Sequence, residues 1–167
     1  MIPDNLKTAM MLVVSALGLV ACVASGDSGT HGNAGGATSP VKAVASMAHC
    51  GFTAPGLVLA TSASDWARFS DSLGARLPAW PDQPDRWLLV ASMGKRNTGG
   101  YSITFNNAEL NDQQLSIAVS QRRPAPDAMV TQALTTPCVV LEIPAQGWRE
   151  LVVTGEPPFP VRRSHPQ

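Results

Sequence analysis

Cysteine and histidine are the side chains of this 167-residue chain best suited to nucleophilic or metal chemistry. The six positions are Cys22, Cys50, Cys138, His31, His49 and His165. His49 and Cys50 are sequence neighbours, but adjacent side chains tend to point apart, and a catalytic pair needs both groups within hydrogen-bond reach. The spacing fits neither a zinc site nor a Cys-x-x-Cys redox pair. We therefore expect no metal site and no catalytic cysteine.

The other polar residues also lack an arrangement that would support catalysis. The chain contains no nucleophile elbow and no glycine-rich phosphate loop, since Gly99-Gly100 alone is too short a signal. The acidic residues are scattered, with no pair that resembles the two carboxylates of a glycosidase. We expect a protein that is not an enzyme, holds no cofactor and takes no small-molecule substrate.

Composition narrows the partners and the fold class. The formal net charge is zero and 14% of the residues are charged, so the chain as a whole has no electrostatic footprint for nucleic acid or for an acidic membrane surface. Fourteen glycines and fourteen prolines indicate many turns and favour a mainly β fold over a helical bundle.

A short apolar run near the N-terminus ends in the motif Leu-Val-Ala-Cys at residues 19–22. This motif resembles the lipobox of bacterial lipoproteins, in which the signal is cut just before a cysteine that carries acyl chains. Lys7 supplies the positive charge that precedes the apolar run at 9–20. The run is shorter than the roughly 20 residues of a spanning helix, and an uncleaved membrane helix is the alternative.

The lipobox resemblance implies a domain order and a location. Residues 1–21 are then a signal peptide, and Cys22 is palmitoylated and holds the protein to a membrane of the cell envelope. In Gram-negative lipoproteins an aspartate after the cysteine favours the inner membrane; Val23 stands here, which favours the cell outer membrane. Periplasmic and surface exposure both remain open.

The rest of the chain divides by composition into three segments. Residues 22–44 are rich in Gly, Ser, Ala and Thr, which predicts a flexible, lipidated tether. Residues 45–155 form the expected β-rich domain. The tail at 156–167 holds four prolines and is expected to lack regular structure.

Export also bears on the two cysteines that remain. Cys50 and Cys138 would meet an oxidising compartment as an even pair, which predicts a disulfide bond between them. Two buried free thiols are the alternative, because free cysteine is among the most buried residue types.

One helix is predicted, with Ser62 or Ser64 as its N-cap, Asp65 in its first turn and Gly74 as its stop. Its apolar stripe follows helical spacing and should pack on a sheet. The stripe consists of Trp66, Phe69 and Leu73.

Alternation of apolar and polar residues predicts the strands. They are expected at 87–91, 101–105, 115–119, 139–143 and 151–153, with a further one at 57–60. The segment 87–91 is apolar on both faces, as in a central strand. A turn at Asn111-Asp112 favours a meander. The expected fold is mainly β (α+β), a small antiparallel barrel or sandwich of five to six strands with one helix packed on it.

Two loops carry a second resemblance. The chain has a Thr-Gly-Gly-Tyr turn at 98–101, a proline-rich loop from Arg123, and Gln-Ala-Leu-Thr-Thr-Pro at 132–137 leading into an apolar strand. In this order and spacing, residues 87–153 resemble the C-terminal domain of the PrcB family, accessory lipoprotein subunits of bacterial surface protease complexes. The resemblance implies a non-enzymatic module that binds another envelope protein, with a protease as one candidate partner.

Physical reasoning places the binding surface on these two loops. Glycine at 99 and 100 can hold a tight exposed turn, and the prolines stiffen the second loop, which lowers the entropy lost on binding. Ordinary hairpin connections are the alternative. The predicted partner-binding residues are Arg96, Asn97, Thr98, Gly99, Gly100, Arg122, Arg123, Pro124, Pro126 and Asp127.

Two other functions remain as alternatives. A Thr-Gly turn beside a rigid proline loop is similar to the chagasin-like inhibitors of cysteine proteases. Their Asn-Pro-Thr-Thr-Gly turn is only partly present at 97–100, and their Arg-Pro-Trp loop is absent. A structural envelope lipoprotein is the other alternative.

Overall fold

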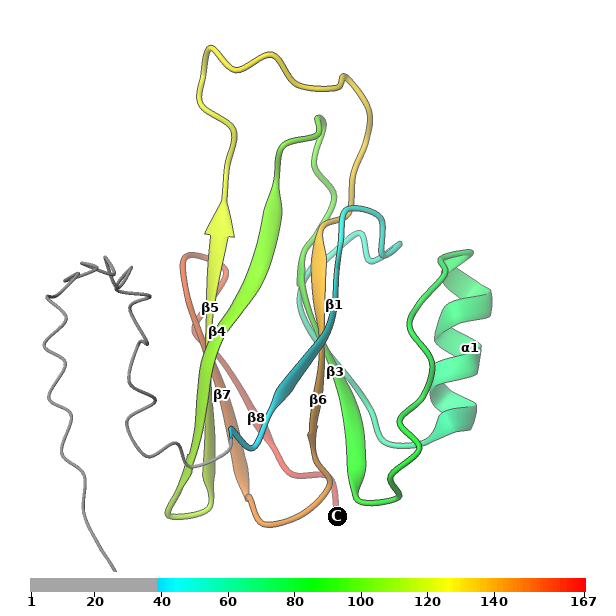
Figure 1. Cartoon of the computed structure of the whole chain (residues 1–167), viewed down its shortest axis with the longest axis vertical. Coiled ribbons are helices and arrows are strands. Elements are labelled where there is room, and N and C mark those ends of the chain that lie inside the picture. The colour runs from blue at the N-terminus through cyan, green and yellow to red at the C-terminus, as the bar shows by residue number, and fades with distance from the viewer. Residues whose placement is uncertain (1–38) are drawn as a thin grey trace, which may run out of the picture. The chain divides into compact units, whose positions relative to one another are not determined.

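The computed structural model describes residues 39–167. The signal peptide predicted at 1–21, the lipidated Cys22 and most of the predicted tether therefore lie outside the described residues. The elements in chain order are β1 (Lys42–Met47), β2 (Pro55–Ala60), α1 (Ala63–Leu73), β3 (Arg86–Met93), β4 (Ser102–Asn111), β5 (Gln114–Arg122), β6 (Cys138–Pro144), β7 (Glu150–Thr154) and β8 (Val161–Ser164) (Figure 1). Within residues 39–167, no helix has the length and apolar character needed to cross a bilayer.

The strands form two four-stranded sheets. The first sheet has the order β1-β6-β3-β2 and is antiparallel throughout. The second has the order β4-β5-β7-β8, and β5 and β7 run parallel in it. The mainly β prediction is confirmed, and the architecture is a sandwich. Eight strands replace the five to six expected, and the β5–β7 pair departs from the expected antiparallel pattern.

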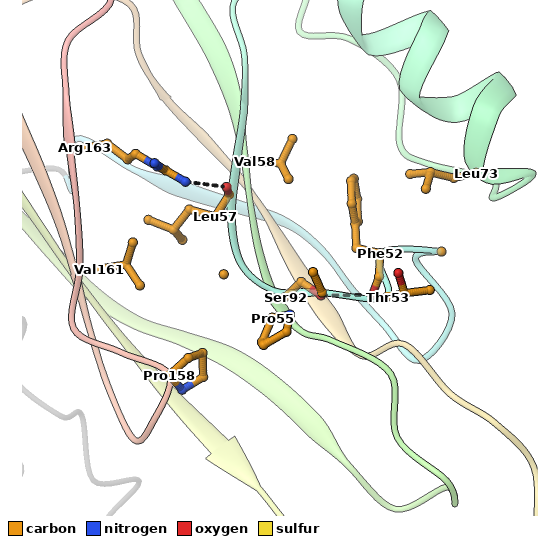
Figure 2. A pocket seen from close by; sticks show the side chains of 13 residues that line it. Phe52, Thr53, Pro55, Leu57, Val58, Leu73, Ser92, Pro158, Val161 and Arg163 are labelled. Carbon is orange, nitrogen blue, oxygen red and sulfur yellow. Dashed lines mark hydrogen bonds between the residues drawn. The ribbon is translucent and has the colours of Figure 1, made fainter.

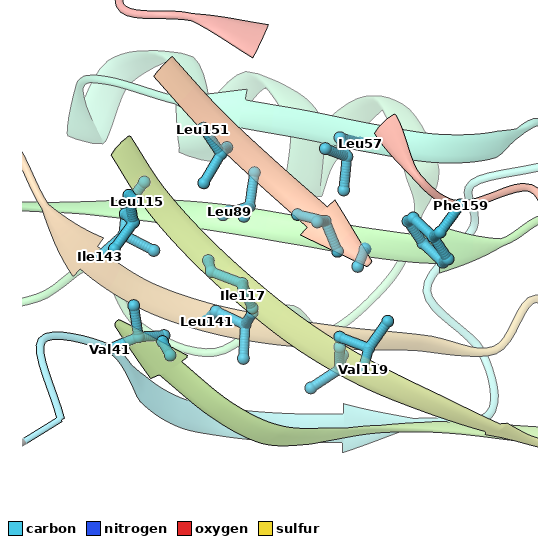
Figure 3. Close-up of a cluster of buried hydrophobic side chains, with 14 of the residues drawn as sticks. Val41, Leu57, Leu89, Leu115, Ile117, Val119, Leu141, Ile143, Leu151 and Phe159 are labelled. Carbon is cyan, nitrogen blue, oxygen red and sulfur yellow. The ribbon is translucent and has the colours of Figure 1, made fainter. Parts of the chain in front are cut away.

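The main core lies between the sheets, where apolar side chains from both inner faces interdigitate (Figure 3). Burying a Val, Leu or Ile side chain completely contributes about 1.5–3 kcal/mol, so this layer is the largest source of stability in the domain. Its fully buried members include Leu89, Leu141 and Ile143 from β3 and β6, and Ile103, Leu115, Ile117 and Leu151 from β4, β5 and β7.

A second cluster fills the space between the first sheet and α1. Leu88 and Val90 of β3 and Val140 of β6 point to this side and are fully buried. Trp66 of α1 covers them, and its indole Nε1 donates a hydrogen bond of 2.7 Å to the carbonyl of Pro78. The prediction that residues 87–91 are buried on both faces is therefore confirmed.

Helix α1 begins and ends where the sequence predicts. Of the two candidate N-caps, Ser62 is the one used, because its hydroxyl accepts a hydrogen bond from the Asp65 amide at 3.1 Å. The Ser62 hydroxyl also donates to the Asp65 carboxylate, and this bond, followed by the one from Arg68, lowers the pKa of Asp65 below its usual value. Gly74 ends the helix in the left-handed conformation, with φ of 58°.

We predict that Ser62→Ala lowers the free energy of unfolding by about 1 kcal/mol at neutral pH, because the Asp65 amide loses its acceptor. Urea unfolding measures this. Ser64→Ala is the matched control and should cost less, since the cap bond stays in place. The pKa of Asp65 is lowered on folding, so its ionised carboxylate stabilises the folded state at neutral pH. This part of the stability is lost as the pH falls through the lowered pKa. Equal losses in the two variants at neutral pH would contradict this assignment.

The predicted meander is confirmed only for the β4–β5 hairpin. Its turn lies at Asp112 and Gln113, with φ of 48° and 65°, one residue later than predicted. The connections from β3 to β4 and from β5 to β6 cross between sheets instead of joining neighbours. The reason is that β3 and β6 are apolar on both faces and need cover on both, whereas β4 and β5 each bury one face.

Both ends of the domain contain more structure than the sequence predicts. Strand β1 starts at Lys42, inside the segment 22–44 that we expected to be a tether. The expectation that the tail lacks regular structure is wrong for Val161–Ser164, which pairs with β7. The tail is held beyond this strand as well. The ring of His165 packs 5.0 Å from the Trp87 ring and 4.5 Å from the Trp148 ring, measured between centroids.

Candidate functional site

The two loops nominated by the sequence lie at the same end of the sandwich (Figure 1). We call residues 94–101, between β3 and β4, the short loop, and residues 123–137, between β5 and β6, the long loop. Arg96 and Thr135 exchange two backbone hydrogen bonds, of 2.8 and 3.0 Å. The Gly99 amide donates to the Thr131 carbonyl at 2.8 Å, and the Thr135 hydroxyl donates to the Thr98 carbonyl at 2.8 Å. The two loops therefore form one joined surface and are not hairpin turns.

Gly100 is required where the two loops meet. Its φ is 83°, a conformation that side-chain-bearing residues rarely adopt. A Cβ at this position would lie 2.9 Å from Cγ1 of Val130 and 3.1 Å from Cβ of Pro124, both in the long loop. Replacing the glycine would force the loops apart.

We predict that Gly100→Ala lowers the free energy of unfolding by about 2 kcal/mol, through backbone strain and the clash with the long loop. Gly74→Ala is the matched control, because Gly74 also has a positive φ but its Cβ would meet nothing within 4 Å. Urea unfolding compares the two, and limited proteolysis should cut the long loop faster in Gly100→Ala alone. Similar proteolysis of both variants would contradict the proposed contact.

The C-terminal end of the long loop is fixed to the β1–β2 connection. The structure contains the predicted disulfide between Cys50 and Cys138, with both residues fully buried and their Cα atoms 6.1 Å apart. Beside the disulfide, the Thr136 carbonyl accepts a hydrogen bond from the Cys50 amide at 3.1 Å, and the Thr136 amide donates one to the Ala48 carbonyl at 2.9 Å. The Thr136 hydroxyl accepts from the Gly51 amide at 2.8 Å. These bonds set the position at which the long loop enters β6.

The other end of the long loop is held more lightly. Gln121, near the end of β5, donates a hydrogen bond from its backbone amide to the Glu156 carboxylate at 2.9 Å. Its side-chain nitrogen donates to the Glu156 carbonyl at 2.8 Å. These contacts are exposed, so they stabilise less than the buried disulfide.

We predict that Cys50→Ala with Cys138→Ala lowers the free energy of unfolding by about 4 kcal/mol, because the bond closes a chain segment of 88 residues. Urea unfolding of the variant and of the oxidised protein measures the difference. A thiol reagent should leave both cysteines of the native, unreduced protein unmodified. Rapid alkylation of this pair would contradict the bridge.

The tip of the long loop is exposed and carries apolar side chains. Met129 is fully exposed and Leu134 is 58% exposed, the two largest values among the large apolar residues that the structure describes. Neither residue is among the predicted partner-binding residues. Both residues stand in a stretch without strand or helix periodicity, which indicates a loop. Whether their side chains are exposed depends on where the fold places that loop, which the sequence does not show.

The predicted partner-binding residues divide into two groups. Arg96 is half-buried, and its guanidinium lies over the Tyr101 ring, 5.4 Å from the centroid, so it braces the short loop. Thr98, Gly99 and Pro124 are also half-buried, consistent with their place at the contact between the loops. The exposed group consists of Asn97, Gly100, Arg122, Arg123, Pro126 and Asp127.

This end of the sandwich has a local charge that the neutral total conceals. The short loop and residues 122–137 contain four basic side chains and one acidic side chain, Asp127. Lys95, Arg122 and Arg123 are exposed. This end of the sandwich therefore carries an excess of exposed cations together with the exposed apolar side chains Met129 and Leu134.

A separate groove of about 520 Å³ lies between the edge strands β2 and β8 (Figure 2). Figure 2 shows Phe52 and Leu73 on one side of it and Val161 and Pro158 on the other. Arg163 is its only ionisable lining residue and donates to the Leu57 carbonyl at 3.5 Å. The lining can hold an apolar group but offers no acid–base pair. Across residues 39–167, no group of three or more His, Cys, Asp or Glu side chains is placed to hold a metal ion.

The fold and the paired loops define a β-sandwich domain with a loop surface at one end. Residues 88–144 match the protein family described as PrcB C-terminal. The matched segment runs from β3 to the end of β6 and includes both loops, which confirms the family resemblance over these residues. Searches of curated proteins and of solved structures found no match.

Proposed function

We propose that this protein is a non-enzymatic module that binds another protein of the cell envelope through the short and long loops. The observation that carries the proposal is the long loop itself, which is fixed at its C-terminal end by a disulfide and joined to the short loop, yet is exposed at its tip. A loop held in this way loses less conformational entropy on binding than a free one. Binding residues are commonly found on loops that a rigid scaffold positions.

The PrcB C-terminal match supports an accessory role beside a larger protein, and an envelope protease is one candidate for that protein. The exposed cations Lys95, Arg122 and Arg123 and the exposed apolar side chains of the long loop also support protein binding, but they do not identify the partner.

Two experiments separate this proposal from the alternatives. A protease inhibitor would block a papain-like or serine protease when the purified domain is added in equimolar amount. A structural component would fractionate with peptidoglycan and inhibit nothing.

We also propose that Cys22 is acylated and attaches the protein to a membrane, the outer one where the cell has two. The support is the motif at 19–22 and the apolar run before it. Each buried CH₂ of an acyl chain contributes about 0.8 kcal/mol, so two chains or more give stable attachment. Metabolic labelling with a palmitate analogue should mark the wild-type protein and leave Cys22→Ser unmarked. Equal labelling of both would refute acylation at this cysteine.

We predict that the full chain, tagged at its C-terminus and extracted from membranes, retains a specific protein, and that Arg122→Ala with Arg123→Ala reduces the retained amount about tenfold. The matched control is Lys42→Ala with Arg149→Ala, which removes two exposed cations at the opposite end of the sandwich. Quantitative mass spectrometry provides the measurement. If both double variants retained the partner equally, the assignment of the binding surface to the two loops would be contradicted.

A further inference from the structure

We infer that the partner presents an apolar socket bordered by carboxylates, and that Met129 and Leu134 enter this socket. The inference rests on the proposed function and adds to it the chemistry of the partner and the two side chains that anchor it.

The apolar part of the argument comes from exposure. Met129 and Leu134 are held in water by a loop whose C-terminal end cannot move freely, so the free protein gains nothing from them. Burying each side chain in a partner would recover about 1.5–3 kcal/mol. Methionine suits this role, since its flexible thioether adapts to irregular surfaces and is enriched in the cores of interfaces.

The carboxylates are inferred from charge. Lys95 of the short loop, Arg122 at the end of β5 and Arg123 at the start of the long loop are exposed, and Asp127 is the only acidic side chain in either loop. Since the chain as a whole is neutral, this excess is a property of the loop surface and not of the protein at large. A partner with acidic groups at the edge of its socket would associate faster and dock in one orientation.

The backbone of the tip favours a protein over a lipid surface. Between residues 123 and 134, the described structure has two backbone–backbone hydrogen bonds, from Ala128 to Ala125 and from Gly99 to Thr131. Most of the remaining amides and carbonyls are left to water, and Asp127 and Gln132 are exposed among them. Hydrocarbon cannot satisfy these groups, and moving them into it is costly. A protein socket can supply donors and acceptors.

Site-specific photocrosslinking tests the inference in the full-length protein. p-Benzoylphenylalanine replaces Met129 in one version and Ser116, on the exposed outer face of β5, in another. Irradiated membranes should yield an adduct with one protein from position 129 and none from position 116. The crosslinked peptide of the partner should contain apolar residues with Asp or Glu beside them.

Charge is tested in the version that carries the probe at position 129. Arg122→Glu with Arg123→Glu should reduce the adduct about tenfold, and about 0.5 M NaCl should weaken it as well. Lys42→Glu with Arg149→Glu, at the far end, should leave the yield unchanged. If the two charge-reversal variants reduced the adduct equally, the inference that carboxylates border the partner's socket would be wrong.

The remaining outcomes separate this inference from the function on which it rests. If the tagged protein retains a partner but position 129 gives no adduct with it, the binding module stands and the socket is wrong. If adducts form with lipid alone, the tip contacts a membrane and the inference is overturned. If no partner is retained and no adduct forms, both proposals fail.

Discussion

Strands β3 and β6 are buried on both faces, and this constraint organises the domain. Leu89 and Leu141 face the second sheet, while Leu88 and Val140 face α1. Two apolar faces require two covers, so a second sheet and a helix must both pack against this pair. The result is three layers with the β3–β6 pair in the middle.

The same pair determines where the candidate binding surface lies. β3 leads directly into the short loop, and β6 starts where the long loop ends; Ser92 lies opposite Cys138 in the register. Both loops therefore emerge from the best-buried part of the molecule. The disulfide at Cys138 and the hydrogen bonds of Thr136 add a fixed point just beyond the sheet. A rigid support under an exposed loop is what a preorganised binding surface needs.

The sequence predicted the elements that have strong local signals. The two-sided strand at 87–91, the helix between Ser62 and Gly74 and the Cys50–Cys138 pair were all found. It did not predict β1 or β8, because their residues are mostly exposed and bury no regular apolar face. Nor did it predict which strands share a sheet, since alternation shows that a face is buried but not what covers it. For the site, it nominated both loops and missed their contact, the bracing role of Arg96 and the exposure of Met129 and Leu134, all of which depend on tertiary structure.

The position of β1 has a consequence for the order in which the chain can assemble. β1 has a single neighbour in its sheet, β6, and Lys42 is paired with Glu142, far along the chain. During synthesis, β1 must therefore wait for β6, which follows much later in the chain. During that interval the first sheet is incomplete and the edge of β3 that pairs with β6 is open, a state in which chains are prone to aggregate. Completion of the first sheet is thus tied to synthesis of the chain through β6, and a chain cut short before β6 has no partner for β1.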